Sequence, residues 1–158
     1  MANGPLLRFL SKAQPIVISL SIAILVYFRS IDLLFLFIGS TICAYVAKGL
    51  KRIIRQPRPL RTNDSSISKK DTFGMPSSHS QVMSFFAYYT FRTVYRDTLF
   101  AIFLYLFTFL VLWSRVKMGH HTLAQVLVGT FIGAIMAHVW YNLWLSKVEF
   151  LQPFLLNI

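Results

Sequence analysis

Five long apolar segments, separated by short polar stretches, dominate the pattern of this sequence. They lie at residues 15–28, 31–50, 77–95, 98–113 and 122–145. A helix that crosses a bilayer needs about 20 mainly apolar residues, so the later segments predict spanning helices, and the shorter first one requires the residues just before it. The pattern predicts an all-α, polytopic membrane helix bundle with about five transmembrane helices. We expect residues 1–158 to form one integral-membrane domain.

Three polar clusters interrupt the apolar pattern, at residues 51–59, 76–79 and 114–125. If every apolar segment crosses the membrane, all three clusters fall on the same membrane face. The second and fourth apolar segments end at this face, and the third and fifth begin there. The pattern therefore predicts one site at that face, built from the region 51–125.

The composition supports a membrane location and narrows the possible partners. Hydrophobic residues make up 56% of the chain and charged residues only 13%, whereas soluble domains average about 25% charged residues. The net charge of +11 favours an anionic partner, either lipid headgroups or an anionic substrate. We expect no nucleic-acid partner, because few basic residues would be free of the bilayer surface. The five acidic residues are too few for the oxygen-rich sites that Mg²⁺ and Ca²⁺ require.

The first two clusters contain groups that can bind phosphate. Lys51 and Arg58 offer a mobile ammonium and a forked guanidinium, although a basic patch that anchors the helix end to lipid headgroups would look similar. The second cluster, residues 76–79, predicts a helix start, with Ser78 and Gln81 in a capping box. Free amides at that start form an anion site, within which His79 could reach a leaving oxygen. The alternative is a plain helix cap with a surface histidine.

The third cluster places His121 and Gln125 on one face of a helix, because they are four residues apart. Small residues continue this stripe at Gly129, Gly133 and Ala137, and such residues let membrane helices approach closely. The stripe should therefore be buried, with His121 and Gln125 facing inward. The alternative, a helix contact with one satisfied histidine, leaves the adjacent Ser114 and Arg115 unexplained.

The other histidines are not expected to act in this site. His120 should point about 100° away from His121 on a helix, and His138 lies far along the last segment and should be a packing residue. Zinc bound by His79, His120 and His121 is conceivable, but adjacent histidines chelate poorly and no acid or cysteine completes the set. We therefore expect no metal and no other cofactor.

Together the clusters resemble the type 2 phosphatidic acid phosphatase superfamily, whose signature is K-x6-RP, PSGH and SR-x5-H-x3-D. The order and spacing match throughout, with Ser78 in place of the glycine and Gln125 in place of the aspartate. The matching positions are Lys51, Arg58-Pro59, Pro76–His79, Ser114-Arg115 and His121.

Within the superfamily, Gly74–Gln81 and the stretch His121–Val126 are similar to the dolichyl diphosphatase branch, which also carries glutamine at the last motif position. The resemblance implies hydrolysis of dolichyl diphosphate to dolichyl phosphate and inorganic phosphate in the endoplasmic reticulum membrane. The lipid carrier would then be re-used for protein N-glycosylation.

The resemblance also implies a role for each residue of the clusters. His121 would attack phosphorus and form a phosphohistidine, and His79 would act as general acid and then general base. Gln125 would orient His121 through its carbonyl oxygen. The terminal phosphate would be held by Lys51, Arg58, Ser77, Ser78, Ser114 and Arg115.

Two alternatives remain open from the sequence. The first is a related lipid phosphatase that acts on phosphatidic acid, a sphingoid phosphate or undecaprenyl diphosphate. The second is a non-catalytic membrane protein whose basic face binds anionic lipid, which the glutamine at position 125 favours. The sequence carries no signal for the oligomeric state.

The orientation in the membrane receives two opposing signals. Only Arg29, Arg92, Arg96 and Lys147 of the 16 basic residues lie on the face opposite the clusters. The positive-inside rule would therefore put the clusters in the cytosol, whereas the resemblance implies the lumen. Because cations that bind substrate confound the rule, we expect the lumen. The sequon at Asn63 lies on the cluster face and can test this.

Overall fold

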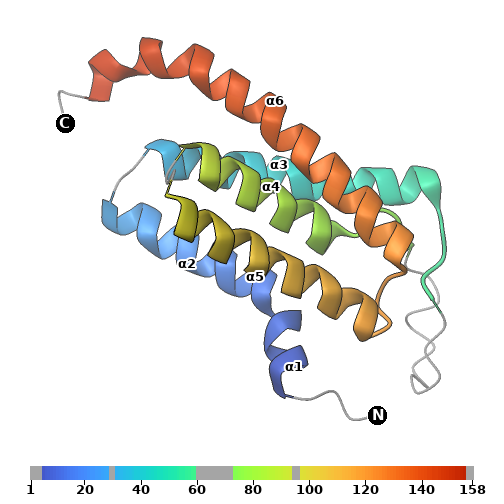
Figure 1. Cartoon of the computed structure of the whole chain (residues 1–158). Coiled ribbons are helices and arrows are strands. Elements are labelled where there is room, and N and C mark those ends of the chain that lie inside the picture. Colours follow the sequence, from blue (N-terminus) through green and yellow to red (C-terminus); the bar gives the residue numbers. More distant parts are fainter. Residues whose placement is uncertain (1–4, 29–30, 60–72, 94–96, 156–158) are drawn as a thin grey trace.

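A computed structural model describes residues 5–28, 31–59, 73–93 and 97–155 of the chain, and every regular element in these ranges is a helix (Figure 1). This confirms the all-α class. The single domain expected for residues 1–158 stays a prediction. The elements are α1 (Pro5–Ser11), α2 (Ala13–Phe28), α3 (Ile31–Ile54), α4 (Ser78–Thr93), α5 (Thr98–Lys117) and α6 (Leu123–Leu155).

Three of the described helices are long and apolar enough to cross a membrane. They are α3, α5 and the part of α6 from Leu123 to Lys147. Helices α2 and α4 have 16 residues each, or roughly 24 Å at 1.5 Å per residue, which is less than the ~30 Å hydrocarbon core. The expected count of about five transmembrane helices is therefore not confirmed.

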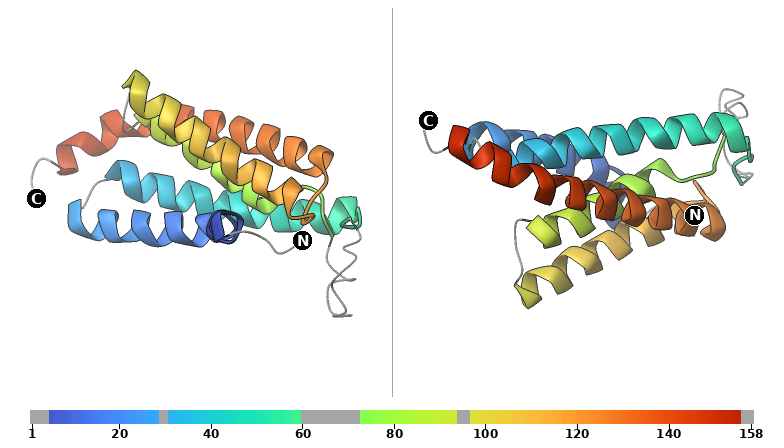
Figure 2. Two further views of the ribbon diagram at one scale, coloured as in Figure 1. Left: turned by 60° about the horizontal axis from the view of Figure 1, so that its bottom comes forward. Right: turned by 90° about the horizontal axis from the view of Figure 1, so that it is seen from above.

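Four helix ends meet at one end of the bundle. They are the C-terminal ends of α3 and α5 and the N-terminal ends of α4 and α6, at the right of Figure 1 and of both views in Figure 2. The Ser77 N–H donates to the Gln125 carbonyl oxygen at 3.1 Å, and the Gln125 side chain donates to the Pro57 carbonyl oxygen at 2.9 Å. The three polar clusters are thus side by side, as their spacing predicts. We call this the cluster end.

Helix α4 is buried on most sides and packs most extensively on α6. The contact is between backbones, because α6 presents glycine where α4 approaches. A Cβ atom added to Gly129 would lie 2.6 Å from the Ser77 carbonyl oxygen, and one added to Gly133 would overlap the Gln81 carbonyl oxygen. Both glycines are buried together with Gln125 and Ala137. The predicted stripe of small residues is therefore correct.

Helix α3 joins this pair through Gln81. The Gln81 Nε2 donates to the Cys43 carbonyl oxygen at 3.2 Å, and the Cys43 thiol donates to the Gln81 carbonyl oxygen at 3.8 Å. Gln81 therefore links α3 to α4 at the level where Gly133 touches α4. A separate hydrogen bond joins α6 to α3, in which Trp140 Nε1 donates to the Phe35 carbonyl oxygen at 2.9 Å.

The predicted capping box of Ser78 with Gln81 is wrong by one position. Ser77 precedes α4, and its Oγ accepts hydrogen bonds from the Ser80 N–H at 3.4 Å and the Ser80 hydroxyl at 2.9 Å. This register follows from burial, because Gln81 is fully buried between α3 and α4 and cannot turn back to the helix start.

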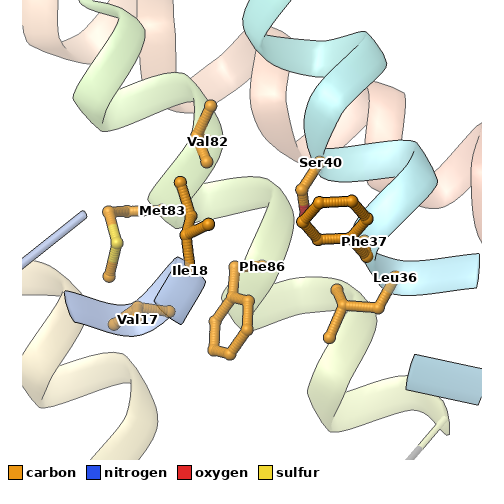
Figure 3. Close-up of a pocket in the computed structure, with 8 residues that line it drawn as sticks. All are labelled: Val17, Ile18, Leu36, Phe37, Ser40, Val82, Met83 and Phe86. Carbon is orange, nitrogen blue, oxygen red and sulfur yellow. The ribbon is translucent and has the colours of Figure 1, made fainter. Parts of the chain in front are cut away.

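An apolar hollow of about 20 Å³ lies between α2, α3 and α4 (Figure 3). It has room for about one water molecule, so a phosphate headgroup does not fit there. Its one polar lining side chain is Ser40, whose Oγ has no hydrogen-bond partner in the described structure. The hollow is separate from the cluster end. It is lined by Val17, Ile18, Leu36, Phe37, Ser40, Val82, Met83 and Phe86.

We expect Gly133→Ala to destabilise the bundle, because the added methyl group must push α6 away from the Gln81 carbonyl. Overpacking of this kind costs about 1–3 kcal/mol, so the thermal unfolding midpoint measured in detergent should fall. Gly49→Ala is the matched control, since a Cβ atom at that position meets nothing within 4 Å. An equal midpoint for the two variants would contradict this account of the helix contact.

Candidate active site

The turn between α5 and α6 fixes the backbone of His121. Helix α5 ends in a Schellman motif, in which the His120 N–H donates to the Arg115 carbonyl oxygen at 3.0 Å and the Gly119 N–H donates to the Val116 carbonyl oxygen at 2.9 Å. Gly119 has φ 66°, a left-handed conformation that glycine adopts without strain. The His121 N–H also donates to the Arg115 carbonyl oxygen, at 3.3 Å. Arg115 and His121 are therefore neighbours through the backbone itself.

Helix α6 then begins with a reciprocal capping box. The Gln125 N–H donates to Thr122 Oγ1 at 3.3 Å, and the Thr122 N–H donates to Gln125 Oε1 at 3.2 Å. The same oxygen lies 3.2 Å from His121 Nδ1. Gln125 is thus both part of the helix start and the partner of the histidine ring, as the sequence predicts for its side chain.

The orientation of the Gln125 amide is determined by its neighbours. The Pro57 carbonyl oxygen can only accept, so the amide atom 2.9 Å from it is Nε2. The Thr122 N–H can only donate, so the atom facing it is Oε1. The hydrogen bond between Oε1 and His121 Nδ1 then requires the proton to be on Nδ1, which leaves the lone pair of a neutral imidazole on Nε2.

Positive charge surrounds this histidine. His121 is 3% exposed, and burial together with the charges of Arg58, Lys51 and Arg115 lowers its pKa to about 4, although the hydrogen bond to Gln125 acts in the opposite direction. Burial also lowers the pKa of Arg58. The imidazole is therefore neutral at neutral pH.

The two acidic side chains whose surroundings the structure describes lie far from these cations. Asp32 lies at the start of α3, and Asp97 caps the start of α5, both at the opposite end of the bundle. Lys51 and Arg58 are half-buried and Arg115 is buried. The cluster end can therefore hold an anion such as phosphate.

His79 belongs to the same cluster. It is half-buried in the first turn of α4, where burial and then the charges of Arg115, His121, Lys51 and His120 lower its pKa to about 3. His138 lies far from the cluster end, as expected, but it is exposed, and its ring contacts the Tyr88 hydroxyl at 2.8 Å and Asn142 Nδ2 at 3.2 Å. His79 in the first turn of α4 and His121 in the turn before α6 are therefore brought together, which suits a nucleophile and an acid–base partner.

The three serines expected to bind phosphate differ in their surroundings. Ser77 is fully buried, and its Oγ accepts a hydrogen bond from the Ser80 hydroxyl. Ser114 is also fully buried, and its hydroxyl donates to the Val111 carbonyl oxygen at 2.6 Å. Ser78 is only partly buried. Both buried hydroxyls hold helix ends in place, and phosphate binding by the serines stays a prediction.

The structure adds two residues that the sequence did not indicate. Gln56 Oε1 accepts a hydrogen bond from Gln125 Nε2 at 3.1 Å, across 69 positions in the chain. Gly74 lies against the same amide, since a Cβ atom there would be 2.6 Å from both Gln125 Oε1 and Nε2. The Gly74 N–H also donates to the Gln56 carbonyl oxygen at 2.7 Å. In the sequence, the only sign of this contact is that a glycine, Gly74, stands two residues before Pro76.

Within the described residues, no group of three or more histidine, cysteine, aspartate or glutamate side chains is arranged to hold a metal ion. Among the described residues, the charged neighbours of His121 are cations rather than carboxylates. The expected independence from metal stays a prediction.

Comparison with known proteins gives a family and several relatives. The sequence profile of the PAP2 superfamily matches residues 30–149. Dolichyldiphosphatase 1 of Homo sapiens is 33% identical over 154 residues, which cover 88% of this chain and 64% of the relative. Dolichyldiphosphatase 1 of Dictyostelium discoideum is 31% identical over 156 residues, covering 91% and 65%.

A further relative has a different name. Lipid phosphate phosphatase epsilon 2, chloroplastic, of Arabidopsis thaliana is 34% identical over 118 residues, which cover 70% of this chain and 39% of the relative. The chain thus spans just under two thirds of the length of the dolichyldiphosphatase relatives. No solved structure matches it.

The lowered pKa of His121 predicts that the folded protein loses stability in mild acid. Between the ordinary value of 6.5 and about 4, the unfolded chain binds a proton that the folded chain does not. Stability is therefore complete above pH 6.5 and falls as the pH drops toward 4. The unfolding midpoint of His121→Gln should fall less between pH 7.5 and 4.5 than that of the wild type. An identical pH dependence would show that His121 is not buried among cations.

Proposed function

The chain belongs to the PAP2 superfamily, and from that premise we propose that it is an integral-membrane phosphatase that hydrolyses a polyprenyl diphosphate. The observation that carries the proposal is the buried His121, whose Nδ1 is held by Gln125 while cations from three segments surround the ring. A neutral imidazole with a free Nε2 lone pair is a nucleophile, and the cations supply the charge that binds a diphosphate.

The reaction proceeds in two displacements. In the first, His79 begins protonated, because the diphosphate anion offsets the nearby cations that lower its pKa. His121 Nε2 attacks the terminal phosphorus, the bond from phosphorus to the bridging oxygen breaks, and His79 donates its proton to that oxygen. In the second, His79 accepts a proton from water, the hydroxide oxygen attacks phosphorus, and the bond from phosphorus to His121 Nε2 breaks. The products are the lipid monophosphate and inorganic phosphate, and both histidines return to their starting forms.

Lys51, Arg58 and Arg115 balance the charge on the phosphoryl oxygens in the transition state. They belong to the end of α3, the segment after it and the end of α5. The positive charge of each of them lowers the pKa of His121. Fixed charges of this kind stabilise the transition state without reorganisation during the reaction. Ser78 at the start of α4 adds a partly exposed hydroxyl to the same anion site.

The lipid part of the substrate remains in the bilayer. The lipid-facing surface of α5 and α6 is apolar, with exposed residues such as Phe103, Phe109, Leu127 and Phe131. The relatives from Homo sapiens and Dictyostelium discoideum are both named dolichyldiphosphatase 1, which supports dolichyl diphosphate as the substrate. The chain would then be a multi-pass protein of the endoplasmic reticulum, its site in the lumen, recycling dolichyl phosphate for N-glycosylation.

We expect His121→Ala to abolish phosphate release from dolichyl diphosphate, because the nucleophile is lost, while EDTA has no effect on the wild type. The matched control is His120→Ala, which removes the adjacent histidine outside the proposed mechanism. Phosphate release in detergent measures both. Turnover by His121→Ala near that of the wild type would contradict the nucleophile assignment.

The same assay separates the alternative functions. Comparing dolichyl diphosphate with phosphatidic acid, a sphingoid phosphate and undecaprenyl diphosphate identifies the preferred lipid. The relative from Arabidopsis thaliana, which is named a lipid phosphate phosphatase, makes monophosphates the important comparison. Absence of turnover on all four lipids would favour a non-catalytic protein that binds anionic lipid.

A luminal site predicts that Asn63 is glycosylated in cells. The sequon at residues 63–65 falls outside the described residues, in the segment between α3 and α4 on the cluster side. Removal of N-glycans should increase the mobility of the wild-type protein on a gel and leave Asn63→Gln unchanged. Cytosolic labelling of a cysteine introduced at position 63 would instead place the site in the cytosol.

A further inference from the structure

Gln125 occupies the position at which the superfamily signature has aspartate, and its surroundings explain the difference. The side chain is fully buried, and both ends of its amide make hydrogen bonds. Oε1 accepts from His121 and Thr122, and Nε2 donates to Gln56 Oε1 and the Pro57 carbonyl oxygen. The residue thus joins the first and third polar clusters.

Gln125 Nε2 donates to Gln56 Oε1 and to the Pro57 carbonyl oxygen, and both of these oxygens are hydrogen-bond acceptors. The Pro57 carbonyl oxygen lies 2.9 Å from Nε2 and has no proton to offer. A glutamate at position 125, which has the length of glutamine, would place an anionic oxygen against this carbonyl, and a buried acceptor without a donor is costly. An aspartate is one methylene shorter and would likewise leave this carbonyl without a donor. Gln56 could turn its amide to donate, but the backbone carbonyl cannot. This site therefore requires an amide at position 125.

Gly74 closes the same pocket from a third side. A side chain at this position would overlap the Gln125 amide, and the Gly74 N–H holds the Gln56 backbone at 2.7 Å. Just before Gln56, Arg55 has φ 51° and its Nε donates to the Arg52 carbonyl oxygen at 2.9 Å. The chain turns sharply there, which brings Gln56 and Pro57 back over the start of α6.

We propose that Gln56 is a positioning residue: with the Pro57 carbonyl and Gly74 it forms an acceptor pocket for the Gln125 amide and, through that amide, keeps the His121 proton on Nδ1. The consequence for turnover rests on the proposed function, whereas the position of the proton is a property of the folded protein. The ring nitrogen that carries the proton is set by the hydrogen bond that it makes. An amide that is free to rotate could present its NH₂ group to Nδ1 and move the proton to Nε2.

The position of the proton can be measured directly. In protein labelled with ¹⁵N-histidine and held in detergent at pH 7.5, nitrogen chemical shifts distinguish protonated from unprotonated ring nitrogens. The His121 signals are assigned by their absence in His121→Gln. We expect the wild type to be protonated on Nδ1, Gln56→Leu to show a mixture of the two forms, and Gln56→Glu, which retains an acceptor, to match the wild type.

A second pair of variants tests the same pocket without changing Gln56. Gly74→Ala should also shift the proton toward Nε2, because the new methyl group displaces the Gln125 amide. Gly49→Ala, where a Cβ atom has no neighbour within 4 Å, should leave the proton on Nδ1. His121 chemical shifts that are unchanged in both Gln56→Leu and Gly74→Ala would overturn the proposal.

Turnover gives an independent readout. In Gln56→Leu we expect kcat for phosphate release to fall about tenfold, the effect of losing one buried hydrogen bond, with KM changed less than twofold. Gln56→Glu should restore kcat. A wild type that is inactive on every lipid but shows the expected chemical shifts would refute the proposed function and leave the positioning role standing. Unchanged kcat together with unchanged chemical shifts in Gln56→Leu would refute the positioning role alone.

Discussion

Backbone contact between α4 and α6 is the constraint on which the site depends. Gly129 and Gly133 let the two helices approach until the carbonyl oxygens of α4 touch α6. The contact continues to the helix ends, where the Ser77 N–H meets the Gln125 carbonyl oxygen at 3.1 Å. The start of the helix that carries His79 is thereby held against the start of the helix that follows His121. A larger residue in the stripe would separate the proposed acid–base group from the proposed nucleophile.

Burial and charge then determine the chemistry available to His121. The ring lies among cations and is kept neutral, so its reactivity depends on where its one proton resides. A carboxylate partner would orient the ring and also raise its pKa, because the negative charge favours the imidazolium. An amide orients the ring without that second effect. With glutamine in place of aspartate, the pKa of His121 is therefore set mainly by burial and by the neighbouring cations.

Much of this arrangement could be predicted from the sequence. The alternation of apolar segments is enough to place the three clusters at one end, because consecutive antiparallel helices return the chain to the same side. The stripe from Gln125 to Ala137 needed only helical periodicity and the size of its residues. The pairing of His121 with Gln125 followed from the same spacing, and the structure has it at 3.2 Å.

The remaining features depend on tertiary contacts that one sequence does not contain. Ser77 and Ser78 are equally good caps by composition, and the choice between them is decided by the burial of Gln81 against Cys43. Gln56 is one polar residue in a basic stretch until its partner 69 positions away is known. The five expected spans were inferred from apolar length alone, whereas α2 and α4 form helices of only 16 residues.

The positive charges of Lys51, Arg58 and Arg115 lie close together, and this affects how strongly the site binds anions. Like charges held close together repel, and the two acidic side chains whose surroundings are described lie at the other end of the bundle. Any anion that enters relieves this repulsion, and it therefore stabilises the folded protein by an amount that grows with the logarithm of its concentration once that exceeds its Kd. Inorganic phosphate, the product of the proposed reaction, carries the same charged oxygens as the group that would react. Under the proposed function, turnover should accordingly slow as phosphate accumulates, so that the rate follows how quickly phosphate is cleared from the compartment.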